Sequence, residues 1–294
     1  GGGFKVTICE RFAPSPTGRL HLGHAFSALL AHDAARAAGG RFLLRIEDLD
    51  RGRARDAFAE GIEADLRWLG LRWDGTPLRQ STRGAAYAAA LARLRSAGLL
   101  YPCVCTRREI AAALSAPQEG AEEPVYPGTC RGADPARLLA SGRPIAWRLD
   151  LAAAFDALGG PEAARALALE EIGAGPAGET GRVPLDPGRL AARLGDVALG
   201  RKDAPASYHL AVVTDDAAQG VTHVTRGEDL FESAMLHRLL QALLDLPAPV
   251  WRHHRLIRDE AGRRLAKRDD ARALATLRAE GATAEDIRRM VGLA

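Results

Sequence analysis

A run of residues near the start of the chain carries the side chains best suited to chemistry. It reads Arg11-Phe-Ala-Pro-Ser-Pro-Thr-Gly-Arg-Leu-His21-Leu-Gly23-His24. The two imidazoles lie at the expected start of a helix, where backbone amides and the helix dipole attract phosphate groups. Gly23 lets a flat base or a ribose approach the backbone. The string predicts a site for a nucleoside triphosphate rather than two ordinary surface histidines.

The elements around this run alternate between strand and helix. Residues 4–12 have β character, and a helix from Leu22 ends at Gly39-Gly40. Residues 41–48 alternate as a second strand, and residues 58–70 form a second helix. This order is typical of a parallel α/β sheet, which binds ligands beyond the carboxyl ends of its strands. The first turn and an acidic stretch that includes Glu47 follow two such ends.

The string from Arg11 to His24 resembles the HIGH signature of class I aminoacyl-tRNA synthetases, in the form found in the glutamyl group. The resemblance implies a second signature, the KMSKS loop, after the last strand of the nucleotide fold. Arg264-Leu-Ala-Lys267-Arg268 stands there in a degenerate form that keeps the second lysine as Lys267.

The reaction implied by this resemblance is in-line attack of an amino-acid carboxylate on the α-phosphate of ATP. Its catalytic residues would be His21, His24 and Lys267. The same three residues and Gly23 would bind ATP, and Mg²⁺ would enter with the nucleotide without a dedicated protein cage.

The resemblance also assigns residues to the amino acid. Arg11 and Arg226 should hold carboxylates, while Glu47 and Tyr208 should hold the ammonium end. The remaining contacts with glutamate would come from Phe12, Ala13, Pro14 and Ser15. Charge balance agrees, because two arginines suit the two carboxylates of glutamate, and glutamine would leave one arginine without an anion. The alternative for Arg226 is a salt bridge to Glu228 or Asp229.

Three of the four cysteines, Cys103, Cys105 and Cys130, are clustered in the sequence. In a reducing compartment such a cluster is more typical of metal ligands than of disulfides. Tetrahedral Zn²⁺ needs four ligands, and spacing alone does not supply the fourth. Tyr126 matches a tyrosine ligand in the small glutamyl-Q relatives, so we expect one structural zinc held by these four residues. The alternative is three metal-free cysteines, and Cys9 is expected in the core.

The predicted fold class is α/β, with a Rossmann-type parallel-sheet nucleotide-binding domain, an inserted zinc-containing subdomain and a short helical C-terminal extension. Residues 1–100 and 201–258 would form the two halves of the catalytic domain. Residues 101–200 would form an inserted, acceptor-type subdomain, and residues 259–294 a KMSKS-like loop with a helical tail. Thr283 and Asp286 have the spacing of a capping box in that tail.

The sequence ends at residue 294, 27 residues after Lys267, which leaves room for two short helices but not for an anticodon-binding domain. This resembles the small glutamyl-Q enzymes, which attach glutamate to queuosine in the anticodon loop of tRNA(Asp). We therefore expect ATP-dependent activation of L-glutamate and its transfer to that base. One alternative is a truncated glutamyl-tRNA synthetase core that charges a tRNA 3′ end. Another is a catalytically idle, zinc-containing RNA-binding paralogue.

Bulk composition fits a soluble globular protein, with 47% hydrophobic and 26% charged residues. A net charge of +3 permits an anionic partner without requiring one. No apolar run is long enough to cross a bilayer, and no signal peptide is evident. We expect a cytoplasmic monomer whose partners are ATP, L-glutamate and queuosine-bearing tRNA(Asp), with no membrane partner.

Overall fold

The structure is a computed structural model that describes residues 6–114, 124–258, 261–262 and 273–294. Its first sheet is parallel and has the order β1-β2-β3. The strands are β1 (Cys9–Phe12), β2 (Arg41–Ile46) and β3 (Leu78–Arg79). Helix α1 (Leu22–Ala37) joins β1 to β2, and α2 (Asp56–Trp68) follows β2. The alternating pattern predicted for the first 70 residues is confirmed.

A second sheet continues the first. Its order is β7-β6-β10-β9, with β6, β10 and β9 parallel and β7 antiparallel. The strands are β6 (Ala168–Glu171), β7 (Gly181–Pro184), β9 (His223–Gly227) and β10 (Val250–His254). Thr222 joins the two sheets, because its backbone N donates to Cys9 O at 2.9 Å and its hydroxyl accepts from Cys9 N at 2.8 Å. The strands β3-β2-β1-β9-β10 therefore follow one another in space, as in a Rossmann-type sheet.

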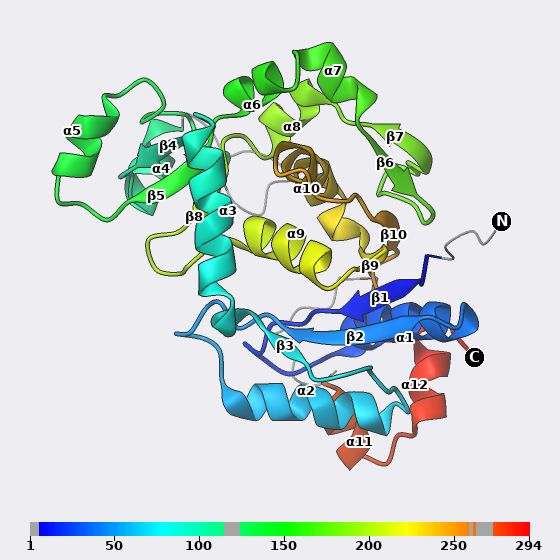
Figure 1. Cartoon of the computed structure of the whole chain (residues 1–294). Helices are drawn as coiled ribbons and strands as arrows, with labels where there is room; N and C mark the ends of the chain where they lie inside the picture. Colours follow the sequence, from blue (N-terminus) through cyan, green and yellow to red (C-terminus); the bar gives the residue numbers. More distant parts are fainter. Residues whose placement is uncertain (1–5, 115–123, 259–260, 263–272) are drawn as a thin grey trace.

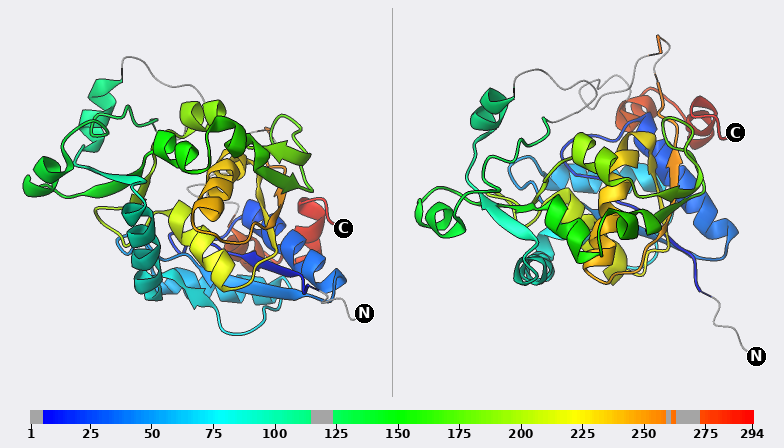
Figure 2. Two further views of the ribbon diagram at one scale, coloured as in Figure 1. Left: turned by 45° about the horizontal axis from the view of Figure 1, so that its top comes forward. Right: turned by 90° about the horizontal axis from the view of Figure 1, so that it is seen from above.

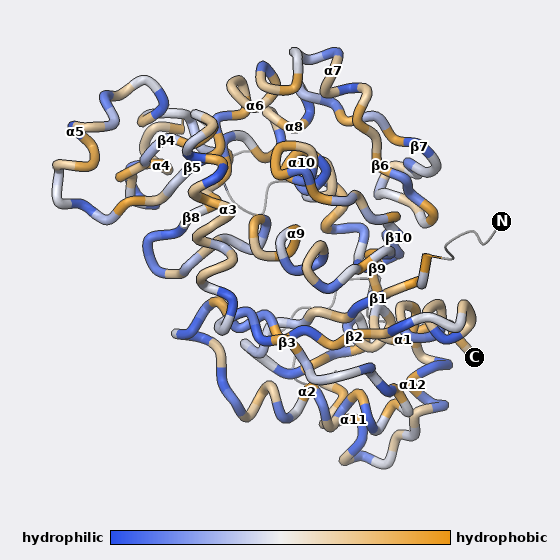
Figure 3. The backbone as a smooth tube through the Cα atoms, viewed as in Figure 1, coloured by the Kyte–Doolittle hydropathy of each residue, from blue (hydrophilic) through white to orange (hydrophobic). Residues whose placement is uncertain are grey.

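Helices cover both faces of these strands. In Figure 1, α9 (Tyr208–Ala218) and α10 (Phe231–Leu243) lie above β1 and β2, and α2 lies below them. The C-terminal helices α11 (Leu274–Ala279) and α12 (Ala284–Met290) lie on the side of α2. Apolar and polar residues alternate along α2 in Figure 3, and its buried residues include Ile62 and Leu66. One buried face per helix is the expected result of this spacing.

A separate lobe projects from the core, at the left of Figure 1 and of both views in Figure 2. Its antiparallel sheet consists of β4 (Leu100–Cys103), β5 (Ala146–Leu149) and β8 (Ala198–Gly200). Two short helices, α4 (Arg107–Ala113) and α5 (Pro135–Ala140), flank it. The long α3 (Gly84–Ser96) leads into the lobe. The remaining helices are α6 (Leu151–Ala157), α7 (Pro161–Ala166) and α8 (Pro187–Arg193), with single 3₁₀ turns η1 (Gln80–Thr82) and η2 (Glu228–Leu230).

The segment 101–200, expected as one insertion, divides between two places. Strands β4 and β5 pair with each other in the lobe, whereas β6 pairs with β10 and belongs to the second sheet. In the tail, Thr283 and Asp286 form the predicted capping box, with hydrogen bonds of 2.8 and 3.1 Å. The KMSKS-like stretch from Arg264 to Arg268, including Lys267, lies outside the described residues. Every helix in the described part of the chain is too short or too polar to span a lipid bilayer.

Candidate active site and cysteine cluster

A cavity of about 710 Å³ opens where the carboxyl ends of β1, β2, β9 and β10 meet the start of α1. Apart from Lys267, every residue that the sequence assigned to ATP or glutamate lines it. These residues are Arg11, Phe12, Ala13, Pro14, Ser15, His21, Gly23, His24, Glu47, Tyr208 and Arg226. The cavity therefore lies beyond the carboxyl ends of the parallel strands, where sheets of this kind bind their ligands.

The two histidines of the first motif cap α1 reciprocally. Gly23 N donates to His21 Nδ1 at 3.0 Å, and His21 N donates to His24 Nδ1 at 3.0 Å. Since both Nδ1 atoms accept, each neutral ring carries its proton on Nε2 and is a hydrogen-bond donor there. The ring centroids are 3.9 Å apart. A Cβ at position 23 would lie 2.8 Å from His21 Cε1, so in this structure Gly23 makes room for a neighbouring ring.

Arg11 forms an ion pair with Asp216, an acidic residue that was not expected at the site from the sequence. Asp216 on α9 accepts from Arg11 Nε and Nη2 and from Arg45 Nη2. Burial acts to raise the pKa of Asp216, but the two guanidiniums outweigh it and lower that pKa to about 2. One signal was available: Asp216 stands eight residues after Tyr208, a spacing that keeps two residues near one face of a helix.

Glu47 follows β2 and is connected to α9 through an amide. Gln80 Nε2 donates to Glu47 Oε2 and to Asp215 Oδ2, both at 3.1 Å. Arg45 Nη1 lies 3.8 Å from Glu47 Oε2 and has no hydrogen-bond partner among the described residues. Burial raises the pKa of Glu47 to about 7, although Arg45 and Arg11 act to lower it. The carboxylate is therefore costly to ionise until it meets another positive charge.

Arg226 is buried, and its hydrogen-bond partners among the described residues are all uncharged. Its Nη1 donates to Tyr208 Oη at 3.1 Å and to His237 Nδ1 at 3.3 Å, and its Nη2 donates to Leu230 O at 3.3 Å. Its Nε donates to His253 Nε2 at 3.2 Å. Within the ranges that the structure describes no ion pair involves Arg226, so the alternative of a salt bridge to Glu228 or Asp229 is not observed there.

Further residues of the cavity wall were not expected from the sequence. They are Ser27, Thr225, Gly227, Asp229, Leu230, His254, Leu256 and Ile257. Ser27 Oγ and His254 Nε2 are 2.5 Å apart, and the Phe26 ring meets the His254 ring edge-on. Most of the others follow the carboxyl ends of β9 and β10, so the topological rule that located Glu47 could have located them as well.

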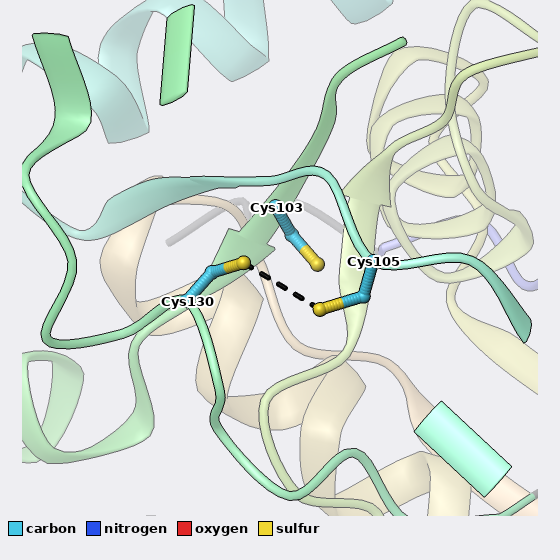
Figure 4. Close-up of side chains that lie close together, drawn as sticks. All are labelled: Cys103, Cys105 and Cys130. Carbon is cyan, nitrogen blue, oxygen red and sulfur yellow. Dashed lines mark hydrogen bonds between the residues drawn. The ribbon is translucent and has the colours of Figure 1, made fainter. Parts of the chain in front are cut away.

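The cysteine cluster forms in the lobe as predicted. The Sγ atoms of Cys103, Cys105 and Cys130 lie within 4.8 Å of one another and point toward a common centre (Figure 4). Tyr126 Oη is 3.4 Å from Cys103 Sγ and 3.5 Å from Cys105 Sγ, and it accepts from Cys130 N at 2.8 Å. The Arg148 guanidinium covers the Tyr126 ring at 3.7 Å. Cys9 is buried in β1, apart from this cluster, as expected for a core residue.

Comparison with known proteins identifies the family. The model of the catalytic domain of class I tRNA synthetases (E and Q) matches residues 7–137 and 180–294. A glutamyl-Q tRNA(Asp) synthetase of Rhodobacter capsulatus is 55% identical over 300 residues, which cover 97% of this chain and 100% of the relative. The protein of the same name from Symbiobacterium thermophilum is 44% identical, over 95% of this chain and 84% of the relative.

Solved structures agree in fold. A glutamate-tRNA synthetase from Elizabethkingia anophelis superposes with a TM-score of 0.69 at 27% identity, over 90% of this chain and 53% of that one. The chain thus spans about half the length of this solved relative. A methionyl-tRNA synthetase from Mycobacterium tuberculosis, at 12% identity and a TM-score of 0.64, shares the fold. The chain belongs to the glutamyl-Q tRNA(Asp) synthetase family and has the catalytic fold of class I aminoacyl-tRNA synthetases.

Proposed function

We propose that this protein activates L-glutamate with ATP and transfers the glutamyl group to queuosine in the anticodon loop of tRNA(Asp). The proposal depends most on Arg226, whose buried guanidinium has uncharged hydrogen-bond partners among the described residues. Arg226 lines the same cavity as the start of α1. A binding site that contains a buried positive charge without an anionic partner favours an anionic ligand. The names of the relatives supply the amino acid and the tRNA.

Glutamate would bind across the cavity with its charges matched. Arg226 would receive one carboxylate, Arg11 would donate its remaining N–H groups to the other, and Glu47 and Tyr208 would receive the ammonium group. Phe12 to Ser15 would line the amino-acid subsite. Glutamine would leave Arg226 without an anion, which in a buried site costs about 2–5 kcal/mol. Selectivity for glutamate follows from that penalty.

ATP would lie at the start of α1. The Nε2–H groups of His21 and His24 and the amides of the first turn would contact the triphosphate, with Gly23 in the same turn. Lys267 would add positive charge from the KMSKS-like stretch, and Mg²⁺ would arrive with the nucleotide. In the reaction, a glutamate carboxylate oxygen attacks the α-phosphorus and pyrophosphate leaves, so catalysis consists of positioning and charge stabilisation.

Zinc would be held by Cys103, Cys105, Cys130 and Tyr126. The donor set fits, because three sulfur atoms and one phenolic oxygen converge in a buried cluster and make four ligands. A closed set of four protein ligands supplies structural cross-linking rather than an open position for chemistry. In this proposal the lobe is a zinc-stabilised subdomain that contacts the tRNA.

The test has two stages. Glutamate-dependent exchange of pyrophosphate into ATP measures activation, and no exchange under any condition would favour the catalytically idle paralogue. Labelled glutamate is then offered to tRNA(Asp) with queuosine and to the same tRNA with guanosine in its place. Nuclease mapping should place the label on the anticodon-loop fragment of the queuosine form alone. Label on the 3′-terminal nucleotide would instead identify a truncated glutamyl-tRNA synthetase core.

A further inference from the structure

A line of buried polar groups runs from Arg226 away from the cavity. Arg226 Nε donates to His253 Nε2 at 3.2 Å, and His253 Nδ1 lies 2.5 Å from Glu171 Oε1. The other oxygen, Glu171 Oε2, accepts from the backbone N of His253 at 2.9 Å and of Gly173 at 3.1 Å. Both Glu171 and His253 are 2% exposed, and neither is among the residues that line the cavity.

The chemistry of these groups fixes where the protons are. A guanidinium only donates, so His253 Nε2 must accept, and the ring proton must be on Nδ1 and donated to Glu171. His253 is then neutral, in agreement with a pKa that burial lowers. The same reasoning makes His237 Nδ1 an acceptor for Arg226, and its Nε2–H donates to His209 Nδ1 at 3.0 Å.

These bonds account for four of the five N–H groups of Arg226. Nε–H goes to His253, both Nη1 hydrogens go to Tyr208 and His237, and one Nη2 hydrogen goes to Leu230 O. Among the described residues the remaining Nη2 hydrogen has no hydrogen-bond acceptor, which leaves it for a ligand. The nearest anion along this line, Glu171, is separated from the guanidinium by a whole imidazole ring. The positive charge of Arg226 is therefore fixed in place without being cancelled by direct contact.

The chain brings Glu171 to this place by a close approach of two backbones. Beyond β6, Ile172 N donates to Trp251 O at 2.8 Å and Ala174 N donates to His253 O at 3.1 Å. A Cβ at Gly173 would lie 2.1 Å from His253 O, so only glycine fits between them. Glu171 comes from the segment 101–200, which the sequence predicted as an inserted subdomain and in which it assigned no residue to the glutamate site.

We infer that Glu171 and His253 are positioning residues that set the orientation and ligand selectivity of Arg226. This inference rests on the proposed function of glutamate activation. Glu171 selects the His253 tautomer, and that tautomer offers the acceptor that aligns the guanidinium. The residues touch no substrate themselves. Loss of the tautomer should weaken glutamate binding and leave ATP binding unchanged.

Glu171→Gln tests this with almost no change of shape. In one orientation the amide oxygen still accepts from the two backbone N–H groups, and the amide NH₂ then faces His253 Nδ1. The ring proton must move to Nε2, where it meets the Arg226 Nε–H, which is also a donor. If the amide turns over, its NH₂ faces the two backbone N–H groups instead. Either way one donor meets another, as when a carboxylate that orients a histidine becomes an amide. We expect the glutamate KM to rise about tenfold or more, with the ATP KM unchanged within about twofold.

The second readout is independent of substrate. Nitrogen-15 spectra of histidine-labelled protein, with His253 assigned by its absence in a substituted variant, should show the proton on Nδ1 in the unsubstituted protein and a changed signal in Glu171→Gln. Asp196→Asn is the matched control, because Asp196 is also 2% exposed and accepts from Tyr101 Oη at 2.6 Å, outside the cavity wall. It should lower stability without changing the glutamate KM.

The outcomes separate the two claims. Without glutamate-dependent exchange in the unsubstituted protein the proposed function fails, while the spectra still decide the tautomer. An unchanged glutamate KM in Glu171→Gln, or a proton on Nε2 in the unsubstituted protein, would overturn the positioning role. If Glu171→Gln does not fold, His253→Asn replaces it, since the shorter amide can reach Glu171 but offers nothing to Arg226. Its glutamate KM should rise similarly, and an unchanged value would also overturn the inference.

Discussion

Asp216 accepts two hydrogen bonds from Arg11, from Nε at 3.0 Å and from Nη2 at 3.1 Å. The same carboxylate accepts from Arg45 Nη2 at 2.6 Å. Arg11 therefore has a direct anionic partner within the protein, one that it shares with Arg45, whereas no ion pair among the described residues involves Arg226. The two arginines that the sequence treated as equivalent carboxylate ligands differ in this respect. Arg226 should dominate the preference for an anionic side chain.

Arg226→Ala is the direct test of that difference. Removing one partner of a buried, hydrogen-bonded charge pair costs about 2–5 kcal/mol, so the glutamate KM should rise about 30-fold or more. The ATP KM should stay within about twofold, since the histidines at the start of α1 are unchanged. Steady-state pyrophosphate exchange at varied glutamate and ATP measures both values. Arg36→Ala, which removes a half-exposed arginine paired with Asp74, should change neither. Equal glutamate kinetics in the two variants would exclude Arg226 from the site.

Asp216→Asn should destabilise the fold, because it leaves two buried guanidiniums without their shared anion. Breaking a buried pair from one side costs about 3–5 kcal/mol. Urea unfolding monitored by tryptophan fluorescence measures the change in the free energy of unfolding. The matched control is Asp33→Asn, since the Asp33 side chain is 45% exposed and pairs with Arg288. An exposed pair contributes about 1 kcal/mol or less. Similar losses in the two variants would contradict the account of Asp216.

The raised pKa of Glu47 gives stability a defined pH dependence. Burial raises this pKa from 4.5 to about 7, so between those values the folded protein keeps a proton that the unfolded chain has lost. The contribution of Glu47 to the free energy of unfolding should therefore fall as pH rises from 4.5 to 7, by about 3 kcal/mol at most. Glu47→Gln should lack this decline.

Urea unfolding of both proteins at several pH values gives the comparison. The difference between their free energies of unfolding should change across the window, and parallel curves would contradict the raised pKa. Glutamate-dependent exchange should increase through pH 7 in the unsubstituted protein, since only the ionised carboxylate attracts the ammonium group. Bound glutamate should in turn shift that pKa downward, because its ammonium favours the charged form.

Much of the site could be predicted because its signals are local. His21, Gly23 and His24 lie within one turn, and the strand before them fixes the end of the sheet at which they stand. The three clustered cysteines are near one another in the sequence, so the local fold of the lobe is enough to bring their Sγ atoms together. Arg226 and Glu47 each follow or end a parallel strand, so topology brings them to one edge.

Other parts depend on contacts between distant segments, which no short pattern records. Asp216 is 205 positions from Arg11, and Glu171 is 82 positions from His253. The sequence around Glu171 gave no reason to expect a strand that pairs with β10, because β6 has only four residues. Its place is decided by pairing with β10, where tertiary packing outweighs local preference.

The cysteine cluster predicts about one zinc per chain, since its four donors form one tetrahedral set. Cys130→Ser should lower the zinc content, and Tyr126→Phe should release zinc to a chelator faster than the unsubstituted protein does. Metal analysis and release kinetics with a chromogenic chelator measure both effects. Cys9→Ala, a change at a buried cysteine outside the cluster, should retain zinc. Zinc well below one equivalent, with a harmless Tyr126→Phe, would argue against this ligand set.

Gly23→Ala should impair activation by moving a histidine rather than by blocking the cavity. The new Cβ would lie 2.8 Å from His21 Cε1 and 3.1 Å from its Nδ1, so the ring must give up its hydrogen bond to the backbone of residue 23. The His21 tautomer is then no longer fixed, and the donor at Nε2 shifts. Misplacement of a positioned group by about 1 Å costs up to about a hundredfold in rate, so kcat for exchange should fall about ten- to a hundredfold.

Gly61→Ala is the matched control for that substitution. Gly61 lies inside α2, and apart from its chain neighbours and the adjacent helix backbone no atom of the described residues lies within 4 Å of the position that a Cβ would take there. Alanine should therefore stabilise that helix by about 1 kcal/mol and leave exchange unchanged. In Gly23→Ala the glutamate KM should stay close to that of the unsubstituted protein, because Arg226 and Glu47 are untouched. A large rise in that KM with kcat preserved would show that His21 acts on the amino acid and not on the nucleotide, which would reverse the division of the cavity into an ATP end and a glutamate end.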